Sequence, residues 1–270
     1  MPDTVLHHKL SGEGEPLILL HGLFGMGDNL ASIARPLSEY FTVYQLDLRN
    51  HGRSFWADSM RFEDMAADVL AFMDKKGLGQ VHLLGHSLGG KVAMQVALMA
   101  PGRVASLVVA DIAPVYYDGN HNEVFAGINA IDLHRLASRQ DAEHILQQHI
   151  EEDGVRLFLL KSLYKNEAGQ FDWRLNTAAI ERCYDDIRQA LTSDKPFNGP
   201  TLFIKGELSA YIQSNHREAI ESLFPQAQLK VIQNTGHWLH AEKPVAFNNV
   251  VKQFLLNKTR HPRAGGGPEL

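Results

Sequence analysis

Cysteine is almost absent from this chain, since Cys183 is the only one among 270 residues. A single cysteine excludes a disulfide within the chain. Cys183 lies in the helix-like stretch AAIERCYDDIRQA, which lacks the signature of a reactive thiol. We therefore expect a buried or half-buried thiol. A cysteine nucleophile paired with a distant histidine stays a formal alternative.

Long apolar runs and a strong excess of one charge are also missing. No run approaches the length of a membrane span, and the polar, mixed N-terminal residues do not resemble a signal peptide. The net charge of -5 gives no electrostatic reason to expect nucleic acid or an anionic membrane as partner. We therefore expect a cytoplasmic protein. The length and the 44% of hydrophobic residues suit one large α/β domain with an insertion.

Residues 81–90, VHLLGHSLGG, join a short apolar run to the motif G-x-S-x-G at 85–89. Residues 91–100 then have the apolar density of a buried helix. A strand, a sharp glycine-flanked turn and a helix are the context that a nucleophile elbow requires. Ser87 is therefore a candidate nucleophile, in a strained turn whose flanking glycines avoid collisions with the neighbouring strand and helix.

The same residues also permit a phosphate-binding interpretation, as a P-loop. Gly85, Gly90 and Lys91 satisfy G-x-x-x-x-G-K, but Val92 stands where a P-loop has the Ser or Thr that holds Mg²⁺. A P-loop also usually lies near the start of its domain, whereas at least three strand-like segments precede this one. We favour the elbow, and a glycine-rich helix start without chemistry is the other alternative.

Strand-like and helix-like segments alternate along the chain. The patterns predict strands at 4–10, 16–20, 41–46, 81–84, 103–110, 201–205 and 229–233. They predict helices at 29–39, 62–75, 91–100, 215–224 and 244–256. This alternation indicates an α/β fold with a mainly parallel sheet and helices on both faces.

The strand pattern disappears between residues 115 and 196, where helical segments dominate. We expect 115–196 to be a helical lid inserted into a core made of 1–114 and 197–258. Some or all of its apolar side chains must then pack on the sheet; examples are Phe125, Ile128, Leu159, Leu160 and Tyr164. Residues 259–270 carry no core positions and are expected to be disordered.

Ser87, Asp111 and His237 each follow a predicted strand directly. Active sites in parallel α/β sheets lie at the carboxyl ends of strands. The order Ser, acid, His is the one found in α/β-hydrolases. These three residues are our candidate triad.

A glycine-rich loop, HGLFG at 21–25, follows the predicted strand 16–20. A strand and loop of this kind supplies one oxyanion-hole amide in α/β-hydrolases. The backbone amides of Leu23 and Leu88 are therefore the candidate oxyanion donors. We expect His21 to order its loop through hydrogen bonds and not to act in catalysis.

Two further polar features could be mistaken for active-site groups. Residues 47–54, DLRNHGRS, follow a strand, but this composition favours a loop tied down by its own hydrogen bonds. His240 competes with His237 for the role of base, but it lies at a helix start, where a structural hydrogen bond is expected.

Six segments make residues 5–256 resemble the α/β-hydrolase superfamily: HGLFG, DLRNHGRS, GHSLGGKVAM, DIAPVYY, FLLKSLY and GHWLHAEKP. The DIAP segment and the lysine after the second glycine resemble the bacterial YbfF-type esterases. The resemblance implies an α/β-hydrolase fold with a helical lid. It also implies a serine carboxylesterase without cofactor or metal, whose substrates are small-molecule acyl esters or thioesters such as acyl-CoA. The oligomeric state is not predicted.

One segment departs from the wider superfamily. After the strand 201–205 many members have G-x-x-D, and that Asp completes the triad, whereas this chain has Gly206-Glu207-Leu208-Ser209. Either Glu207 acts from a shifted position, or the acid comes from another strand. The subgroup resemblance implies the second choice, Asp111.

In this assignment Ser87 attacks an acyl carbonyl, His237 transfers the proton and Asp111 orients the imidazole. Enzymes of the same fold with other chemistry, such as C–C hydrolases, haloperoxidases or lyases, form the second class of candidates. A non-catalytic binding protein is the third. A serine at position 87 argues against reactions that need a carboxylate nucleophile.

Overall fold

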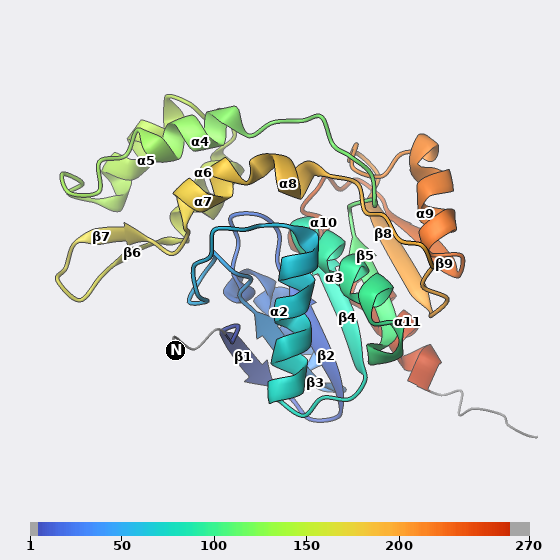
Figure 1. The fold of residues 1–270 in the computed structure, drawn as a ribbon. Coiled ribbons are helices and arrows are strands. Elements are labelled where there is room, and N and C mark those ends of the chain that lie inside the picture. The colour runs from blue at the N-terminus through green and yellow to red at the C-terminus, as the bar shows by residue number, and fades with distance from the viewer. Residues whose placement is uncertain (1–4, 260–270) are drawn as a thin grey trace, which may run out of the picture.

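Apolar runs build the central sheet of this protein, whose computed structural model describes residues 5–259 (Figure 1). The seven strands occur in the order β1-β3-β2-β4-β5-β8-β9. Only β1 is antiparallel to its neighbour, and every other pair in this sheet is parallel. The strands are β1 (His8–Ser11), β2 (Glu15–Leu20), β3 (Phe41–Leu46), β4 (Val81–His86), β5 (Val104–Ala110), β8 (Thr201–Gly206) and β9 (Ala227–Ile232). The predicted mainly parallel sheet is confirmed.

Strand β4 lies in the middle of the sheet and is buried along its whole length. It pairs with β2 on one side and with β5 on the other. Because neighbouring strands run parallel, their carboxyl ends meet at one edge of the sheet. The residues that follow β2, β4, β5, β8 and β9 therefore emerge close together.

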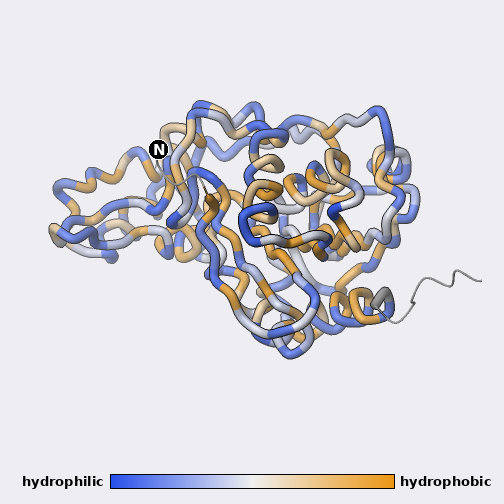
Figure 2. The backbone as a smooth tube through the Cα atoms, turned by 60° about the horizontal axis from the view of Figure 1, so that its bottom comes forward, coloured by the Kyte–Doolittle hydropathy of each residue, from blue (hydrophilic) through white to orange (hydrophobic). Residues whose placement is uncertain are grey.

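Helices cover both faces of the sheet, as the alternation predicts. On one face, α2 (Phe62–Lys75) and α3 (Leu88–Met99) share a core with the sheet. On the other face, α1 (Ala31–Leu37) and α11 (Pro244–Thr259) do the same. The shorter α9 (Arg217–Leu223) and α10 (Leu239–Glu242) flank β9 in sequence. Figure 2 shows hydrophobic residues concentrated within the body of the fold and hydrophilic ones along its outer loops.

Residues 115–196, here named the inserted segment, lie between two adjacent strands, β5 and β8. The segment extends across the top of the view in Figure 1. Its elements are α4 (Asn122–Asn129), α5 (Arg139–Gln147), α6 (Asp153–Leu160), β6 (Leu163–Lys165), β7 (Phe171–Trp173), α7 (Thr177–Arg182) and α8 (Tyr184–Arg188).

Helices dominate the inserted segment, as expected, but it also contains a short hairpin, β6–β7, that the sequence pattern did not indicate. Its three-residue strands, LYK and FDW, are too short for any alternating pattern to emerge. The turn between them depends on Asn166, whose side chain accepts hydrogen bonds from the amides of Ala168 and Gln170, and on Gly169 at φ +75°. Helix α6 ends at Leu160, three residues before this hairpin begins.

Some apolar side chains of the inserted segment pack against the sheet core, as expected, because Ile187 and Leu191 belong to the same cluster as residues of β4 and β5. Others do not. Phe125, Ile128, Leu159 and Leu160 belong to a separate core formed within the segment. From the α/β core, this cluster includes Phe24 of the loop after β2. Short helices that fold back on one another can bury their apolar faces without the sheet. The sequence therefore did not show which of these side chains pack on the sheet and which pack on one another.

Several element boundaries differ from the predicted ones by a few residues. The first strand is His8–Ser11 instead of 4–10, and the helix after Ser87 begins at Leu88 instead of Lys91. The tail predicted to be disordered lies, apart from Thr259, outside the described residues. Within 5–259, no helix is both long and apolar enough to cross a lipid bilayer.

Candidate active site

Ser87 occupies a sharp turn between β4 and α3, with φ 53° and ψ -120°. A non-glycine residue with positive φ carries backbone strain. The turn is possible because its neighbours are glycines. A Cβ on Gly85 would lie 2.1 Å from the carbonyl oxygen of Gly89, and one on Gly89 would lie 2.3 Å from that of Leu20. The motif therefore has the close packing of a nucleophile elbow.

Asp111 follows β5 and is completely buried. Its Oδ2 lies 2.8 Å from Nδ1 of His237, and its Oδ1 accepts a hydrogen bond of 3.0 Å from the amide of Gly206. The hydroxyl of Ser209 donates a further hydrogen bond to Oδ2. A buried carboxylate needs such partners, and here β8, its loop and the loop after β9 provide them.

The loop after β9 holds His237 with its side chain 25% exposed. Tyr211 stacks on the imidazole, with ring centroids 4.0 Å apart. The loop backbone is fixed by Glu207, whose Oε2 accepts a 2.7 Å hydrogen bond from the amide of Asn234. Glu207 thus lies near the histidine loop, but it is Asp111 that contacts the imidazole.

His86, the residue before Ser87, also positions this loop. Its Nε2 lies 2.8 Å from the carbonyl oxygen of His237, so this nitrogen donates the hydrogen bond. Burial, followed by the neighbouring His240 and His237, holds the pKa of His86 well below its ordinary value. A neutral imidazole therefore links the strand before the nucleophile to the loop that carries His237.

A cavity of about 720 Å³ opens beside Ser87 and His237. The core contributes loop residues such as Leu23 and Tyr211, and the inserted segment contributes residues such as Val155. The size is within the range of small-molecule sites. Most of the accessible lining is apolar, which suits an acyl chain.

The two candidate oxyanion donors both line this cavity. Leu88 is the first residue of α3, where helix N–H groups have no partner within the helix. Leu23 lies in the loop after β2, which approaches the elbow closely, because a Cβ on Gly22 would lie 3.3 Å from Cβ of Ser87. Among the residues described, neither the Leu23 nor the Leu88 amide has a hydrogen-bond acceptor.

Two buried histidines order the loop after β2. His21 contacts its neighbouring carbonyl, Gly22 O, through Nδ1 and accepts a hydrogen bond from the Leu48 amide at Nε2. His51 accepts one from the amide of Phe24, and burial lowers its pKa to about 3. The expected ordering role of His21 is thus confirmed by its contacts.

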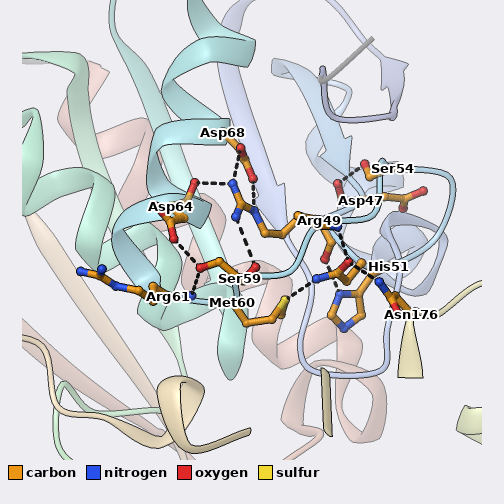
Figure 3. Close-up of polar contacts among 12 residues, drawn as sticks. Asp47, Arg49, His51, Ser54, Ser59, Met60, Arg61, Asp64, Asp68 and Asn176 are labelled. Atoms are coloured by element: carbon orange, nitrogen blue, oxygen red, sulfur yellow. Dashed lines mark hydrogen bonds and ion pairs between the residues drawn. The ribbon is translucent and has the colours of Figure 1, made fainter. Parts of the chain in front are cut away.

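The polar loop after β3 is tied down by hydrogen bonds, as its composition predicts (Figure 3). Arg49 forms a bidentate pair with Asp68 of α2, at 2.6 and 2.8 Å. Asp47 accepts hydrogen bonds from the amides of Gly27 and Arg53. The same loop meets the inserted segment, since the Asn176 side chain and backbone both bond to Asn50. In the described chain no residue of 47–54 lines the cavity.

The structural hydrogen bond expected for His240 is absent from the described part of the chain. Its buried Nδ1 has no partner there, and the ring packs against His86 and Phe247. Burial, reinforced by His237, lowers the pKa of His240 to about 4. Cys183 is buried as expected, and its Sγ donates to the Asp58 carbonyl at 3.1 Å.

Three residues around the candidate triad escaped sequence reasoning: His86, Ser209 and Tyr211. Each acts through a contact between segments far apart in the chain, such as the 151 residues that separate His86 from His237. Only Ser209 carried a signal, because it stands where many α/β-hydrolases have the acid. Within 5–259, no group of three or more His, Cys, Asp or Glu side chains could hold a metal ion.

Comparison with known proteins gives consistent matches along the chain. Residues 15–143 and 120–244 match the family described as alpha/beta hydrolase fold. Esterase YbfF of Escherichia coli is 38% identical over 243 residues, which is 89% of this chain and 92% of that protein. The sn-1-specific diacylglycerol lipase ABHD11 of Mus musculus is 38% identical over 264 residues, 94% of this chain and 86% of that protein.

A solved structure shows the same likeness in three dimensions. The structure titled Marine microorganism esterase superposes with a TM-score of 0.91 at 42% sequence identity. The match covers 93% of this chain and all of the other chain. The likeness therefore includes the inserted segment as well as the α/β core.

Proposed function

The chain belongs to the α/β-hydrolase fold family and is an ester hydrolase of the esterase/lipase type, and on that premise we propose that it acts through an acyl-enzyme on Ser87. One observation carries the proposal. Ser87 lies in the elbow beside a cavity that His237 also lines, and His237 contacts the buried carboxylate of Asp111. This arrangement has the residue types and roles of a Ser-His-Asp triad.

The proposed reaction has two halves. Ser87 Oγ attacks the acyl carbonyl carbon while Nε2 of His237 takes the hydroxyl proton. Asp111 stabilises the imidazolium, and the amides of Leu23 and Leu88 bind the oxyanion. The intermediate then expels the alcohol or thiol, which receives the proton from His237. A water molecule attacks the acyl-enzyme with the same base, and Ser87 leaves with its proton restored.

The substrate in this proposal is a small-molecule acyl ester or thioester. The apolar part of the cavity takes the acyl chain, and acyl-CoA remains within the proposed class. No cofactor or metal takes part in the proposed steps, and we place the enzyme in the cytoplasm.

We assign the inserted segment, residues 115–196, the role of a lid. Its residues Val155, Leu159 and Tyr184 line the same cavity as Ser87. Lid side chains of this kind set which acyl chains fit.

A substrate panel tests the proposal. The panel contains p-nitrophenyl esters from acetate to dodecanoate, matched acyl-CoA thioesters, and mono- and diacylglycerols, the last because of the mouse relative's name. We expect turnover of at least one ester class by the wild type, and a loss of about 10⁶-fold in kcat for Ser87→Ala. Ester turnover that survives in folded Ser87→Ala would overturn the proposal. Absence of turnover throughout the panel would instead favour C–C cleavage or other chemistry on this fold.

A further inference from the structure

Lys91 is a buried lysine that the proposed reaction does not use, and burial lowers its pKa to about 7. Its side chain is 1% exposed and lies in the first turn of α3, four residues after Ser87. Both the burial and the position are unfavourable for an ammonium ion. Burial removes its hydration, and the N-terminal end of a helix dipole repels positive charge. The charged form of Lys91 therefore depends on the groups that surround Nζ.

Backbone carbonyl oxygens surround the ammonium group. Nζ donates hydrogen bonds to Gln189 O at 2.5 Å, to Val115 O at 2.7 Å and to Arg188 O at 3.4 Å. An ammonium has three N–H donors, whereas a neutral amine has two, so three acceptors match the charged form. The rings of Phe62 and Tyr117 lie 5.3 and 4.9 Å from Nζ, within the range of cation–π contacts.

The three carbonyls belong to the two ends of the inserted segment. Val115 begins the segment, Arg188 is the last residue of its last helix, α8, and Gln189 follows that helix. The stretches 114–117 and 188–191, here named the neck, run past one another and share two backbone hydrogen bonds of 3.0 and 3.1 Å. Lys91 reaches both halves of the neck from the helix that begins at the nucleophile.

We propose that Lys91 is a positioning residue that fastens the neck to α3 and thereby sets the shape of the cavity beside Ser87. Lys91 itself lines that cavity, together with Tyr117 and Arg188 of the neck. A shift of the neck therefore moves part of the wall that an acyl chain contacts. The link from neck to substrate rests on the proposed esterase function, but the link from Lys91 to the neck does not.

Two other roles for Lys91 fit the structure less well. The motif resemblance to a P-loop suggests a phosphate ligand, but the ammonium donors are directed at carbonyl oxygens. A direct electrostatic effect on the oxyanion at Ser87 is the other alternative, because Lys91 lies in the first turn of α3 and Ser87 directly precedes that helix. That role would lower kcat for every ester alike, whereas fastening the neck changes KM according to acyl length.

The test compares Lys91→Met, which removes the donors at similar volume, with Lys91→Arg, which retains a cation and donors. Lys161→Met, which removes an exposed lysine of the inserted segment, is the matched control. Hydrogen–deuterium exchange with mass spectrometry reports on peptides from the neck and from β4. Kinetics on p-nitrophenyl acetate and octanoate report on the cavity.

For Lys91→Met we expect exchange in the neck to rise about tenfold or more, as hydrogen bonds to a charged group are lost, with β4 unchanged. KM for octanoate should rise about five- to tenfold, with kcat for acetate within about threefold of wild type. Lys91→Arg should recover part of both effects, and Lys161→Met should match wild type.

Unchanged exchange in the neck of Lys91→Met would overturn the proposal. So would an equal loss of kcat on both esters with KM unchanged, since that points to an effect on the oxyanion. If Lys91→Met does not fold, the same measurements are made on Lys91→Gln. This variant removes the ammonium group and shortens the side chain, but it leaves two N–H donors in the buried site. If the wild type hydrolyses no ester, the proposed function fails while the exchange data still decide the role of Lys91.

Discussion

The hydroxyl of Ser209 donates a hydrogen bond to Oδ2 of Asp111, the carboxylate oxygen that lies 2.8 Å from Nδ1 of His237. Ser209 stands at the position where many α/β-hydrolases carry their triad acid. In this chain a hydroxyl from that position supports a carboxylate supplied by another strand, β5. The carboxylate is thereby held between β5, the loop after β8 and the loop after β9.

The two candidate acids should differ sharply when each is replaced by its amide. Asp111→Asn removes the charge that stabilises the imidazolium, and we expect a loss of about 10³- to 10⁴-fold in kcat. Glu207→Gln should lose less than about tenfold, because the amide oxygen can still accept from the Asn234 backbone. Ser209→Ala should fall between them, at about tenfold, since one donor to a buried carboxylate is lost. Steady-state kinetics on one good ester measures all three.

Circular dichroism must first show that the three variants are folded. A larger loss for Glu207→Gln than for Asp111→Asn would move the acid to Glu207. Small losses in both would reduce the triad to a dyad of Ser87 and His237.

Filling the cavity from the inserted segment should change the preference for acyl length. Val155 lines the cavity and is half-buried, so Val155→Trp occupies space that a long chain needs. We expect kcat/KM for octanoate to fall about tenfold or more relative to acetate. Leu157 is 55% exposed and outside the cavity, so Leu157→Trp is the control and should leave the ratio unchanged. Equal losses on both esters for Val155→Trp would argue that the segment does not select chain length.

The elbow should tolerate no side chain at Gly85. A Cβ there would lie 2.1 Å from Gly89 O, so Gly85→Ala must displace backbone atoms. We expect a cost of about 2 kcal/mol or more in the free energy of unfolding, measured by urea denaturation. At Gly102 an added Cβ meets nothing within 4 Å, so Gly102→Ala should change stability by less than about 0.5 kcal/mol. Equal stabilities for the two variants would contradict the tight packing of this turn.

His240 should make the folded state sensitive to mild acid. In the unfolded chain its pKa is the ordinary 6.5, and in the fold burial lowers it to about 4. The unfolded state therefore binds the proton first. The stability associated with the neutral ring is complete above pH 6.5 and is lost as the pH falls toward 4. Between pH 7.5 and 5 this loss amounts to about 2 kcal/mol.

Urea denaturation at the two pH values isolates this contribution. His240→Gln should lose about 2 kcal/mol less than wild type over the interval, whatever its stability at pH 7.5. His134→Gln replaces an exposed histidine and should lose as much as wild type. The same pH dependence in all three proteins would mean that His240 is not held neutral by the fold.

The alternating core was predictable because its strands are continuous apolar runs. Parallel strands also bring their carboxyl ends to one edge, so the positions of Ser87, Asp111 and His237 made them candidates. The choice of Asp111 over Glu207 rested on the subgroup resemblance. The inserted segment was less predictable. Its hairpin has strands of three residues, and the partners of Phe125 depend on how short helices fold on one another.

Contacts between distant segments account for the other differences. His240 was expected to hydrogen-bond near its helix start, but rings from elsewhere enclose it. Lys91 attracted attention through an incomplete P-loop motif and as a marker of the esterase subgroup, but its carbonyl partners lie up to 98 residues away. No local pattern encodes such pairings, because they are set by packing of the whole fold.

The central claim is that Ser87 becomes acylated. Its surroundings distinguish it from other serines, since it combines a positive φ with a place beside the cavity that His237 lines. A nucleophile in such a triad reacts with electrophiles that imitate the acyl group, whereas ordinary serine hydroxyls do not.

Intact-mass measurement after treatment with a fluorophosphonate probe, followed by peptide mapping, tests this claim most directly. We predict one adduct per chain, located on Ser87, and no adduct in Ser87→Ala. Wild-type protein that is folded yet remains unlabelled, or that carries the adduct on another residue, would contradict the account.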